Sequence, residues 1–294
     1  MTDKKIVLTG AHSYLGQKLV SDLLNIGGFE VTAFITPWAE SDGLVSGVGI
    51  RYLKADLTQQ LSGDAAHAVH EADRVLHFAW IRGKDEGEVL ESNLTMLANL
   101  QRHLARPETL VFISSVAASP NTLSRYGRTK FTIANKLLED GAIVLVTGLI
   151  VDKEPKGPYK LLVDVVRKLP LSVRFTPDSV KVYPIRTDDF LSAIITVLNA
   201  DAASGSYRVY PSNAADINEF LEHLEKKYRR GRLKLPVSYK LGLGSLRGMH
   251  QAGLLPSKLG EKLLTFLYKD DEYLATHRTL EGTESLERPL DEMI

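Results

Sequence analysis

The chain of 294 residues contains no cysteine, so it has neither a disulfide framework nor a thiolate metal site, and it suits a reducing compartment. Lys plus Arg equal Asp plus Glu at 36 each, which leaves no basic excess for nucleic acid. The eight histidines are scattered, and none stands in an HExxH arrangement, so we expect no metal. No apolar run reaches the ~18 residues needed to cross a bilayer, and the first residues lack signal-peptide features. These absences predict a cytoplasmic protein without nucleic-acid or membrane partners.

Segments with the apolar spacing of strands and of helices alternate through the first half of the chain. The expected strands are 5–9, 29–35, 50–53, 74–78, 109–113 and 142–147, and the expected helices are 15–25, 65–70, 88–104 and 126–139. Apolar strands that alternate with helices predict an α/β fold, a doubly wound parallel sheet of the Rossmann type with helices on both faces. The connections should be right-handed.

The pattern changes after about residue 150. We expect a loop over 153–158, strands over 180–185 and 207–210, a helix over 188–198 and mainly helices from 216 onward. These elements predict a dinucleotide-binding domain over 1–152, to which 180–210 return. The stretches 153–179 and 211–294 then form a smaller, mainly helical substrate-binding part. The basic run 226–230 is read as a solvated helix end rather than a phosphate site.

A glycine-containing turn joins the first expected strand to the first helix. In a dinucleotide-binding turn, glycines make the bend, admit the pyrophosphate and let helix and strand pack closely. The corresponding positions here are Gly10, Ser13 and Gly16, so serine replaces the middle glycine. An ordinary strand–helix turn is the alternative, and the position at the first β–α junction favours nucleotide binding.

Tyr126 and Lys130 are four residues apart, so a helix places both side chains on one face. An ammonium beside a phenol favours the phenolate and lowers its pKa from the usual ~10. The pair could therefore exchange a proton near neutral pH, although this spacing is also common on helix surfaces.

Together these motifs make the chain resemble the extended short-chain dehydrogenase/reductases, the NAD-dependent epimerase/dehydratase family that acts largely on nucleotide sugars. The resemblance covers roughly residues 1–210. The matching motifs are TGAHSYLG at 9–16, Asp56-Leu57, VLHFA at 75–79, Asn93, FISS at 112–115, YGRTK at 126–130 and Asp188-Asp189, the last of which a helix cap explains equally well.

The resemblance implies roles for individual residues. Tyr126 would be the general acid or base, Lys130 would lower its pKa and bind the nicotinamide ribose, and Ser115, rather than Ser114, would orient the substrate oxygen. Polar capping of the strand end is the alternative for both serines. The implied cofactor-binding residues are Gly10, His12, Ser13, Tyr14, Leu15, Gly16, Thr36, Asp56, Leu57, Phe78, Ala79, Trp80, Asn93 and Lys130.

Three departures from the family pattern bear on these roles. Only 126 − 115 = 11 positions separate Ser115 from Tyr126, so the active-site loop is short. Thr36-Pro37 follows the second strand where an acid would select NAD and an arginine would accept NADP, so either cofactor remains allowed. Ser13 adds a side chain beside the expected pyrophosphate.

The first function that we expect is an NAD(P)-dependent reductase or dehydrogenase for a keto or hydroxyl group, on a small-molecule substrate that is most often a nucleotide sugar in this family. The alternatives are a nucleotide-sugar epimerase and a non-catalytic dinucleotide-binding regulator. A dehydratase is disfavoured because Val116-Ala117, which follows Ser115, cannot transfer a proton. By analogy, a homodimer would form through helices 88–104 and 126–139. Candidates for binding a substrate diphosphate are Lys160, Arg174, Lys181, Arg186 and, as the alternative to its reading as a helix end, the basic run 226–230.

Overall fold

The structure is a computed structural model, and it describes residues 3–40, 42–83, 85–168, 171–176, 180–200, 202–228, 233–254, 257–279 and 288–294. The chain divides into two compact units, each made of three separate stretches. Unit 1 comprises Met1–Ser114, Thr132–Leu145 and Leu191–Tyr207. Unit 2 comprises Ser115–Phe131, Val146–Phe190 and Arg208–Ile294.

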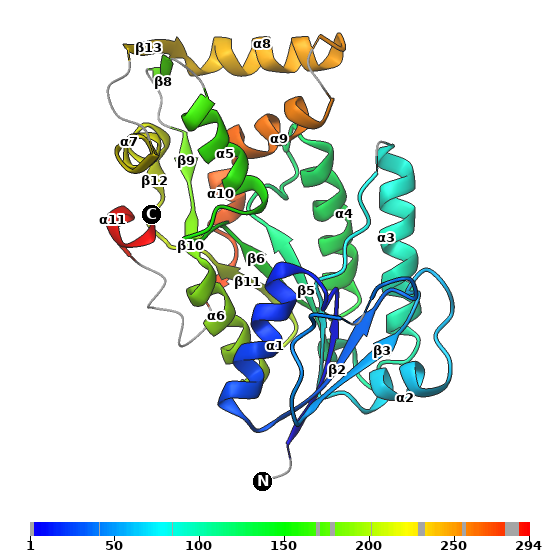
Figure 1. Ribbon diagram of the computed structural model, residues 1–294. Coiled ribbons are helices and arrows are strands. Elements are labelled where there is room, and N and C mark those ends of the chain that lie inside the picture. The colour runs from blue at the N-terminus through cyan, green and yellow to red at the C-terminus, as the bar shows by residue number, and fades with distance from the viewer. Residues whose placement is uncertain are drawn as a thin grey trace. The chain divides into compact units, whose positions relative to one another are not determined.

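An eight-stranded sheet forms the centre of the fold, with strand order β14-β11-β6-β5-β4-β1-β2-β3 (Figure 1). The strands are β1 Lys4–Thr9, β2 Phe29–Ile35, β3 Ile50–Lys54, β4 Arg74–His77, β5 Leu110–Ser115, β6 Ile143–Thr147, β11 Gly205–Val209 and β14 Arg278–Thr279. β1 pairs in parallel with β2 and β4, β2 with β3, and β4 with β5. The predicted doubly wound parallel sheet is therefore confirmed.

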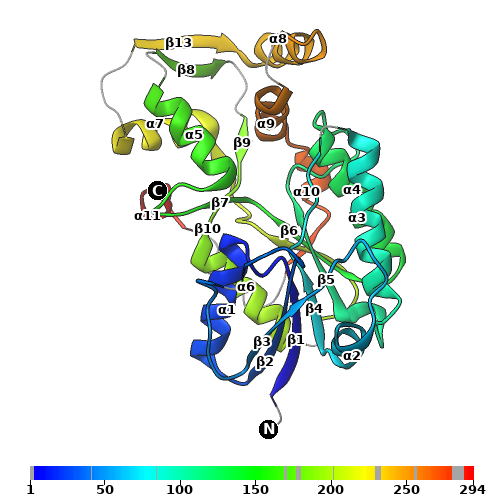
Figure 2. The same ribbon diagram turned by 45° about the vertical axis from the view of Figure 1, so that its right-hand side comes forward.

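Helices cover both faces of this sheet. Figures 1 and 2 show α1 and α6 on one side and α2, α3 and α4 on the other. Their bounds are α1 Tyr14–Ile26, α2 Gly63–Glu71, α3 Glu86–Gln101, α4 Arg125–Glu139 and α6 Thr187–Asn199, with a 3₁₀ turn at Pro107–Thr109. The strands are buried because helices lie over both of their faces: Ile6, Val7 and Leu8 of β1 are at most 2% exposed.

Helix α1 shows how the local sequence sets an element of this layer. Its apolar residues Leu19, Val20 and Leu23 recur at helical spacing and are at most 1% exposed. Ser13 caps its start, and Gly27, with φ of 73°, ends it in a left-handed conformation that glycine adopts without strain.

Unit 2 contains most of the carboxyl-terminal elements. They are β7 Leu149–Val151, α5 Gly157–Lys168, β8 Leu171–Thr176, β9 Lys181–Val182, β10 Pro184–Arg186, β12 Ala215–Asp216, α7 Ile217–Tyr228, β13 Leu233–Ser238, α8 Tyr239–Gln251, α9 Ser257–Leu267, α10 Asp271–Leu274 and α11 Leu290–Met293. β7 pairs with β10, β9 with β12, and β8 with β13, each as a two-stranded sheet. A hydrophobic core between α5 and α7 includes Tyr159, Val163, Phe220 and Leu224.

The elements of the first half agree with prediction, with small shifts. Helix α3 ends at Gln101 instead of 104, and Thr109 belongs to the 3₁₀ turn rather than to β5. The predicted loop 153–158 is wrong at its end, because α5 begins at Gly157 and Pro158 is tolerated in a first helical turn, where a missing N–H costs nothing.

The predicted strand over 180–185 is also wrong, because Tyr183 divides it into β9, which pairs antiparallel with β12, and β10, which pairs in parallel with β7. The helix over 157–168 and the paired strands β8 and β13 were not predicted. The domain division at residue 152 remains a prediction, and the two compact units have other boundaries. None of the described helices combines the length and apolar character that crossing a bilayer requires.

Candidate functional site

The turn after β1 can only be made with glycine. Gly10 has φ of +69°, and a Cβ placed on it would lie 2.8 Å from Ala79 N and 2.9 Å from Phe78 C. A Cβ on Gly16 would lie 2.7 Å from Gly10 O. Both glycines of the predicted motif are therefore required, because the backbone of unit 1 leaves no room for a side chain at either position. At Gly10 the end of β1 lies close to the residues that follow β4, and at Gly16 helix α1 lies close to the turn before it.

Ser13 is the N-cap of α1, with an extended backbone (φ −71°, ψ 159°). Its Oγ accepts a hydrogen bond from Gly16 N at 3.1 Å. The backbone at this middle position does not need glycine, which explains how serine can replace it. The first turn of α1 carries no acidic residue, so the positive end of the helix dipole suits a dinucleotide phosphate.

A buried hydrogen-bond pair links the ends of β1 and β4. Thr9 Oγ1 lies 3.0 Å from His77 Nδ1 and accepts a hydrogen bond from Ala79 N at 3.2 Å. Thr9 and His77 are both at most 1% exposed. This pair, which sequence reasoning missed, fixes the backbone that approaches Gly10.

Asn93 of α3 is completely buried and holds the segment that follows β4. Its Oδ1 accepts from Ile81 N at 3.0 Å, and its Nδ2 donates to Ile81 O at 3.0 Å and to Val89 O at 2.6 Å. The described contacts of Asn93 are to backbone groups, so its observed role is to shape the predicted cofactor-binding segment.

The remaining predicted cofactor residues lie at strand ends, in turns or in the first turn of α1, all within unit 1. Asp56 Oδ1 accepts from Thr58 N at 2.9 Å and from Thr58 Oγ1 at 2.7 Å, which forms a local turn. Leu57 is buried, and its carbonyl accepts from Asn99 Nδ2 at 2.9 Å. His12 is exposed, and the partly buried positions are Tyr14, Leu15, Thr36, Phe78, Ala79 and Trp80. Their contacts with a cofactor stay predictions.

Ser115 ends β5 and begins the short loop that leads to α4. Its Oγ accepts a hydrogen bond from Ala117 N at 3.2 Å, and the side chain is partly buried. Ser114 is 2% exposed, and its Oγ has no hydrogen-bond partner in the part of the chain that the structure describes. The short loop is itself packed, since Val116, Ala117, Ala118 and Ser119 are at most 4% exposed.

Tyr126 and Lys130 lie one turn apart at the start of α4, as predicted. Tyr126 is partly buried, and Lys130 is 6% exposed. Ser124 Oγ caps the helix by accepting from Gly127 N at 3.0 Å. Gly127 has no room for a side chain, because a Cβ would overlap Ala117 O and Thr122 Oγ1. The loop therefore packs directly against the turn that carries the tyrosine.

Glu261 of α9, which sequence reasoning missed, holds the same helix start. Its Oε1 accepts from Tyr126 N at 2.9 Å, and its Oε2 lies 3.4 Å from Arg125 Nε and 3.6 Å from His250 Nε2. The Glu261 side chain is 17% exposed. A carboxylate at this place satisfies an N–H that the helix leaves unpaired and complements the helix dipole.

The cations proposed for a substrate diphosphate already face carboxylates in unit 2. The pairs are Lys160–Asp164 at 2.7 Å, Arg174–Glu225 at 2.7 Å, Lys181–Asp271 at 3.5 Å and Arg186–Asp188 at 3.2 Å. Within 226–230, Arg229 and Arg230 lie outside the described residues. Asp189, part of the predicted Asp-Asp signature, forms a two-bond pair with Arg288 at 2.7 and 2.9 Å.

An aromatic and acidic cluster anchors α10 within unit 2. Tyr183 OH donates to Asp271 Oδ1 at 2.6 Å, and Tyr210 OH donates to Leu274 O at 2.6 Å. Burial, followed by the hydrogen bond to Asp271, raises the pKa of the Tyr183 phenol. Tyr183 is therefore a structural phenol rather than a proton donor near neutral pH.

The comparisons with known proteins agree with the motifs. The model of the NAD dependent epimerase/dehydratase family matches residues 6–136. A search of curated proteins gives no match. The solved structure of UDP-N-acetylglucosamine 4-epimerase from Methanobrevibacter ruminantium M1, in complex with UDP-N-acetylmuramic acid, is 17% identical, with a TM-score of 0.61 over 81% of this chain and 86% of that one.

Two other solved structures share the fold. The Bordetella bronchiseptica enzyme WbmG, in complex with NAD and UDP, is 14% identical, with a TM-score of 0.61 over 81% of this chain and 82% of that chain. The protein gox2253 is 13% identical, with a TM-score of 0.67 over 99% of this chain and 96% of that chain. At these identities the structures establish the fold alone. The match of the family model over residues 6–136 agrees with the resemblance found in the motifs, and in this stretch the chain is similar to the NAD dependent epimerase/dehydratase family.

Proposed function

We propose that the chain is an NAD-dependent enzyme that oxidises and reduces a carbon–oxygen centre of a nucleotide-linked sugar, with epimerisation as the net reaction. The family description and the NAD and UDP of the WbmG complex support the cofactor and the substrate class. The observation that carries the proposal is the start of α4, where Tyr126 and Lys130 lie one turn apart on a helix held by Ser124 and Glu261.

NAD would be held at the Gly10–Gly16 turn and the first turn of α1, whose close backbone approach and lack of acidic residues fit a pyrophosphate. When bound, NAD supplies the acceptor for the hydride that leaves the substrate carbon and returns it later. Without an acid at Thr36, the turn accepts NADP as well.

The side chains of α4 and of the loop before it would carry out the proton transfer. Tyr126 would take the proton of the substrate hydroxyl as the hydride leaves and return it to the oxygen on reduction. The buried ammonium of Lys130 would stabilise the phenolate. Because Ser115 Oγ accepts from Ala117 N, its own O–H remains able to donate to the substrate oxygen.

A reductase that exchanges its cofactor in each cycle is the second candidate. The specific observation in its favour is Thr36-Pro37, which lacks the ribose-binding acid that would help an epimerase to retain NAD. The two candidates differ in what the purified protein carries. Retained NAD, identified after denaturation, supports the epimerase, whereas an empty protein that binds NADH or NADPH reversibly supports the reductase.

The test of the proposed chemistry is Tyr126→Phe. We expect turnover of a UDP-sugar to fall by a factor of ~10² to 10⁴, while the affinity for NADH changes little. Retained turnover would remove Tyr126 from its role. If the unaltered protein binds no dinucleotide, the proposal of an NAD-dependent enzyme is refuted, and a function that needs no dinucleotide is favoured.

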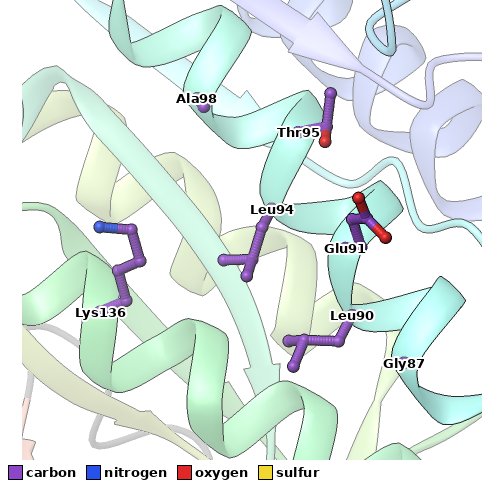
Figure 3. A pocket seen from close by; sticks show the side chains of 7 residues that line it. All are labelled: Gly87, Leu90, Glu91, Leu94, Thr95, Ala98 and Lys136. Carbon is purple, nitrogen blue, oxygen red and sulfur yellow. The ribbon is translucent and has the colours of Figure 1, made fainter.

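We also propose that the enzyme is a homodimer built on α3 and α4. A shallow apolar groove of about 380 Å³ runs along α3, lined by Gly87, Leu90, Glu91, Leu94, Thr95, Ala98 and Lys136. Figure 3 shows Leu90 and Leu94 of α3 pointing toward the side bordered by Lys136 of α4. The same helices of a second copy would bury these leucines. The lack of cysteine supports a cytoplasmic location for such an enzyme.

A further inference from the structure

The amide groups at the start of α4 obtain their acceptors from two places in unit 2. Gly127 N donates to Ser124 Oγ at 3.0 Å, and Arg128 N donates to Ser124 O at 3.0 Å, so both of these bonds are local. Tyr126 N instead donates at 2.9 Å to Oε1 of Glu261, 135 positions away in α9, which lies beside the start of α4 (Figures 1 and 2). Because the first N–H groups of a helix have no partner within the helix, the backbone at Tyr126 depends on α9 for its acceptor.

The carboxylate of Glu261 is itself held by contacts on both of its oxygens. Oε1 accepts from Tyr126 N, while Oε2 lies 3.4 Å from Arg125 Nε and 3.6 Å from His250 Nε2. The side chains of Glu261 and His250 are 17% and 16% exposed. A carboxylate that is shielded in this way and contacted on both oxygens has few rotamers available, so it presents Oε1 to Tyr126 N in one place.

Helix α8 reaches Glu261 because the residue before it in α9 is a glycine. A Cβ on Gly260 would lie 2.8 Å from His250 Cγ and would overlap His250 Nδ1. The imidazole ring therefore packs directly on the backbone of α9. Its Nδ1 is buried without a hydrogen-bond partner in the described part of the chain, so the polar contact of the ring is made by Nε2, toward Glu261.

Two further contacts within unit 2 tie the segment around Tyr126 to the residues of α10. Asn121, in the loop before α4, donates from Nδ2 to Asp270 Oδ2 at 3.0 Å. Phe131 packs edge-on against Tyr273, with ring centroids 5.5 Å apart. Asp270 is the N-cap of α10 and accepts from Tyr273 N at 3.1 Å, so the two partners belong to one local structure. The segment that carries the tyrosine is thus held at both ends as well as in its middle.

We propose that Glu261 is a positioning residue, which fixes the place of the Tyr126 phenol through the backbone amide of Tyr126. The inference rests on the proposed role of Tyr126 in proton transfer. Such a transfer requires donor and acceptor atoms about 2.6–3.2 Å apart. Only two side-chain torsions separate the phenol ring from Cα, so a shift of the backbone at Tyr126 carries the hydroxyl with it. A displacement of about 1 Å can reduce turnover ~100-fold.

A purely structural cap is the alternative interpretation. Glu261 would then contribute to the free energy of unfolding and leave turnover per folded molecule unchanged. The contacts favour positioning, because the group that Glu261 binds is the amide of the tyrosine itself, and because the neighbouring amide of Gly127 is already capped by Ser124. The two interpretations differ in what they predict for the phenol of Tyr126.

The test compares the full chain with Glu261→Ala, Glu261→Gln and, as the matched control, Glu272→Ala, which removes an exposed carboxylate of α10. The first measurement is fluorine nuclear magnetic resonance of protein labelled with 3-fluorotyrosine. Among the signals of the 11 tyrosines, that of Tyr126 is the one that Tyr126→Phe removes. Glutamine keeps an acceptor oxygen for Tyr126 N and alanine does not. We expect the Tyr126 signal to shift or broaden in Glu261→Ala and to match that of the unaltered chain in the other two variants.

The second measurement is turnover of UDP-N-acetylglucosamine with NAD, expressed per folded molecule. In Glu261→Ala we expect kcat to fall by a factor of ~10 to 100, while KM and the affinity for NADH change by less than about twofold. Glu261→Gln should recover kcat to within about threefold of the unaltered chain, and Glu272→Ala should equal it. If Glu261→Ala does not fold, Glu261→Asp, which keeps the charge but withdraws the oxygen by one methylene, takes its place with the same expected changes.

The outcomes separate this proposal from the proposed reaction. An unchanged Tyr126 signal in Glu261→Ala would overturn the positioning role whatever the activity, and so would an unchanged kcat. A loss in Glu261→Gln as large as in Glu261→Ala would show that the charge acts rather than the hydrogen bond, which also overturns it. If the unaltered chain turns over no UDP-sugar while the Tyr126 signal responds as expected, the proposed reaction is refuted and the positioning of Tyr126 by Glu261 stands.

Discussion

The carboxylate of Glu261 gives a direct measure of how α9 stabilises the start of α4. Glu261→Ala removes the acceptor of the Tyr126 N–H bond and leaves that donor, in a partly buried place, without the carboxylate. A hydrogen bond to a charged group contributes ~1.5–3 kcal/mol, and a negative charge at a helix N-terminus adds ~0.3–1 kcal/mol. The ion pair with Arg125, whose side chain is 32% exposed, adds little. We therefore expect a loss of about 2–4 kcal/mol in the free energy of unfolding.

The matched variants separate charge from hydrogen bonding. Glu261→Gln keeps an acceptor oxygen and should cost about 1 kcal/mol, because only the charge is lost. Glu154→Ala removes a loop carboxylate whose side chain is 82% exposed and which pairs with Lys156 at 3.6 Å, and it should change stability by less than about 0.5 kcal/mol.

The assay is urea unfolding followed by far-ultraviolet circular dichroism, combined with amide hydrogen exchange of the peptide around Tyr126. Loss of the acceptor should speed exchange at the start of α4 more than elsewhere in that helix. Should Glu261→Ala prove as stable as Glu154→Ala, with unchanged exchange over the first turn of α4, the reasoning about this cap would be refuted.

Three further changes test other parts of the structure. Gly127→Ala forces a Cβ against Ala117 O, so unfolding free energy should fall by about 3 kcal/mol or more in urea, and an unchanged midpoint would contradict the packing. Burial lowers the pKa of His277 to about 4, whereas the unfolded chain binds that proton near pH 6.5. The free energy of unfolding should therefore fall by up to about 3 kcal/mol as the pH drops from about 6.5 to about 4. In His277→Phe, the free energy of unfolding should depend less on pH over this range. Leu94→Glu places a charge in the groove on α3 and should shift the mass measured by light scattering from dimer to monomer, with exposed Val48→Glu as the control.

Local patterns in the sequence predicted the parts of the fold and site that depend on neighbouring residues. The mainly apolar stretch 29–35, which follows the Gly27-Gly28 break, became β2 with the same bounds. The four-residue spacing of Tyr126 and Lys130 placed both on the first turns of α4. The serines before α1 and α4 carry a cap signal that could have been read, since both hydroxyls accept the N–H three residues later.

Contacts between distant residues could not be predicted in this way. Glu261 is 135 positions from Tyr126, and one carboxylate in an amphipathic helix looks like any solvated residue. Strands β8 and β13 pair across 62 positions, from Leu171↔Leu233 onward, and β13 is largely exposed, so neither strand shows the alternation or the apolar run that would reveal it in the sequence. The sequence predicted that the loop before α4 is short. The dense packing of this loop against Gly127 is a tertiary contact, which the number of residues in the loop does not reveal.

Because unit 1 is made of three separate stretches of the chain, it can fold completely only after the last stretch has been synthesised. Leu198 O and Ala200 O, which lie in its last stretch, accept hydrogen bonds at 3.0 Å from Lys4 Nζ and Arg74 NH2 of the first stretch. Residues 115–207 must therefore be translated after Ser114 before the unit can close, which takes about 5–20 s at typical elongation rates. Throughout that interval the last stretch of unit 1, which includes most of α6, has not yet been made, so the amino-terminal stretch cannot complete the unit and its apolar strands stay open to wrong pairing.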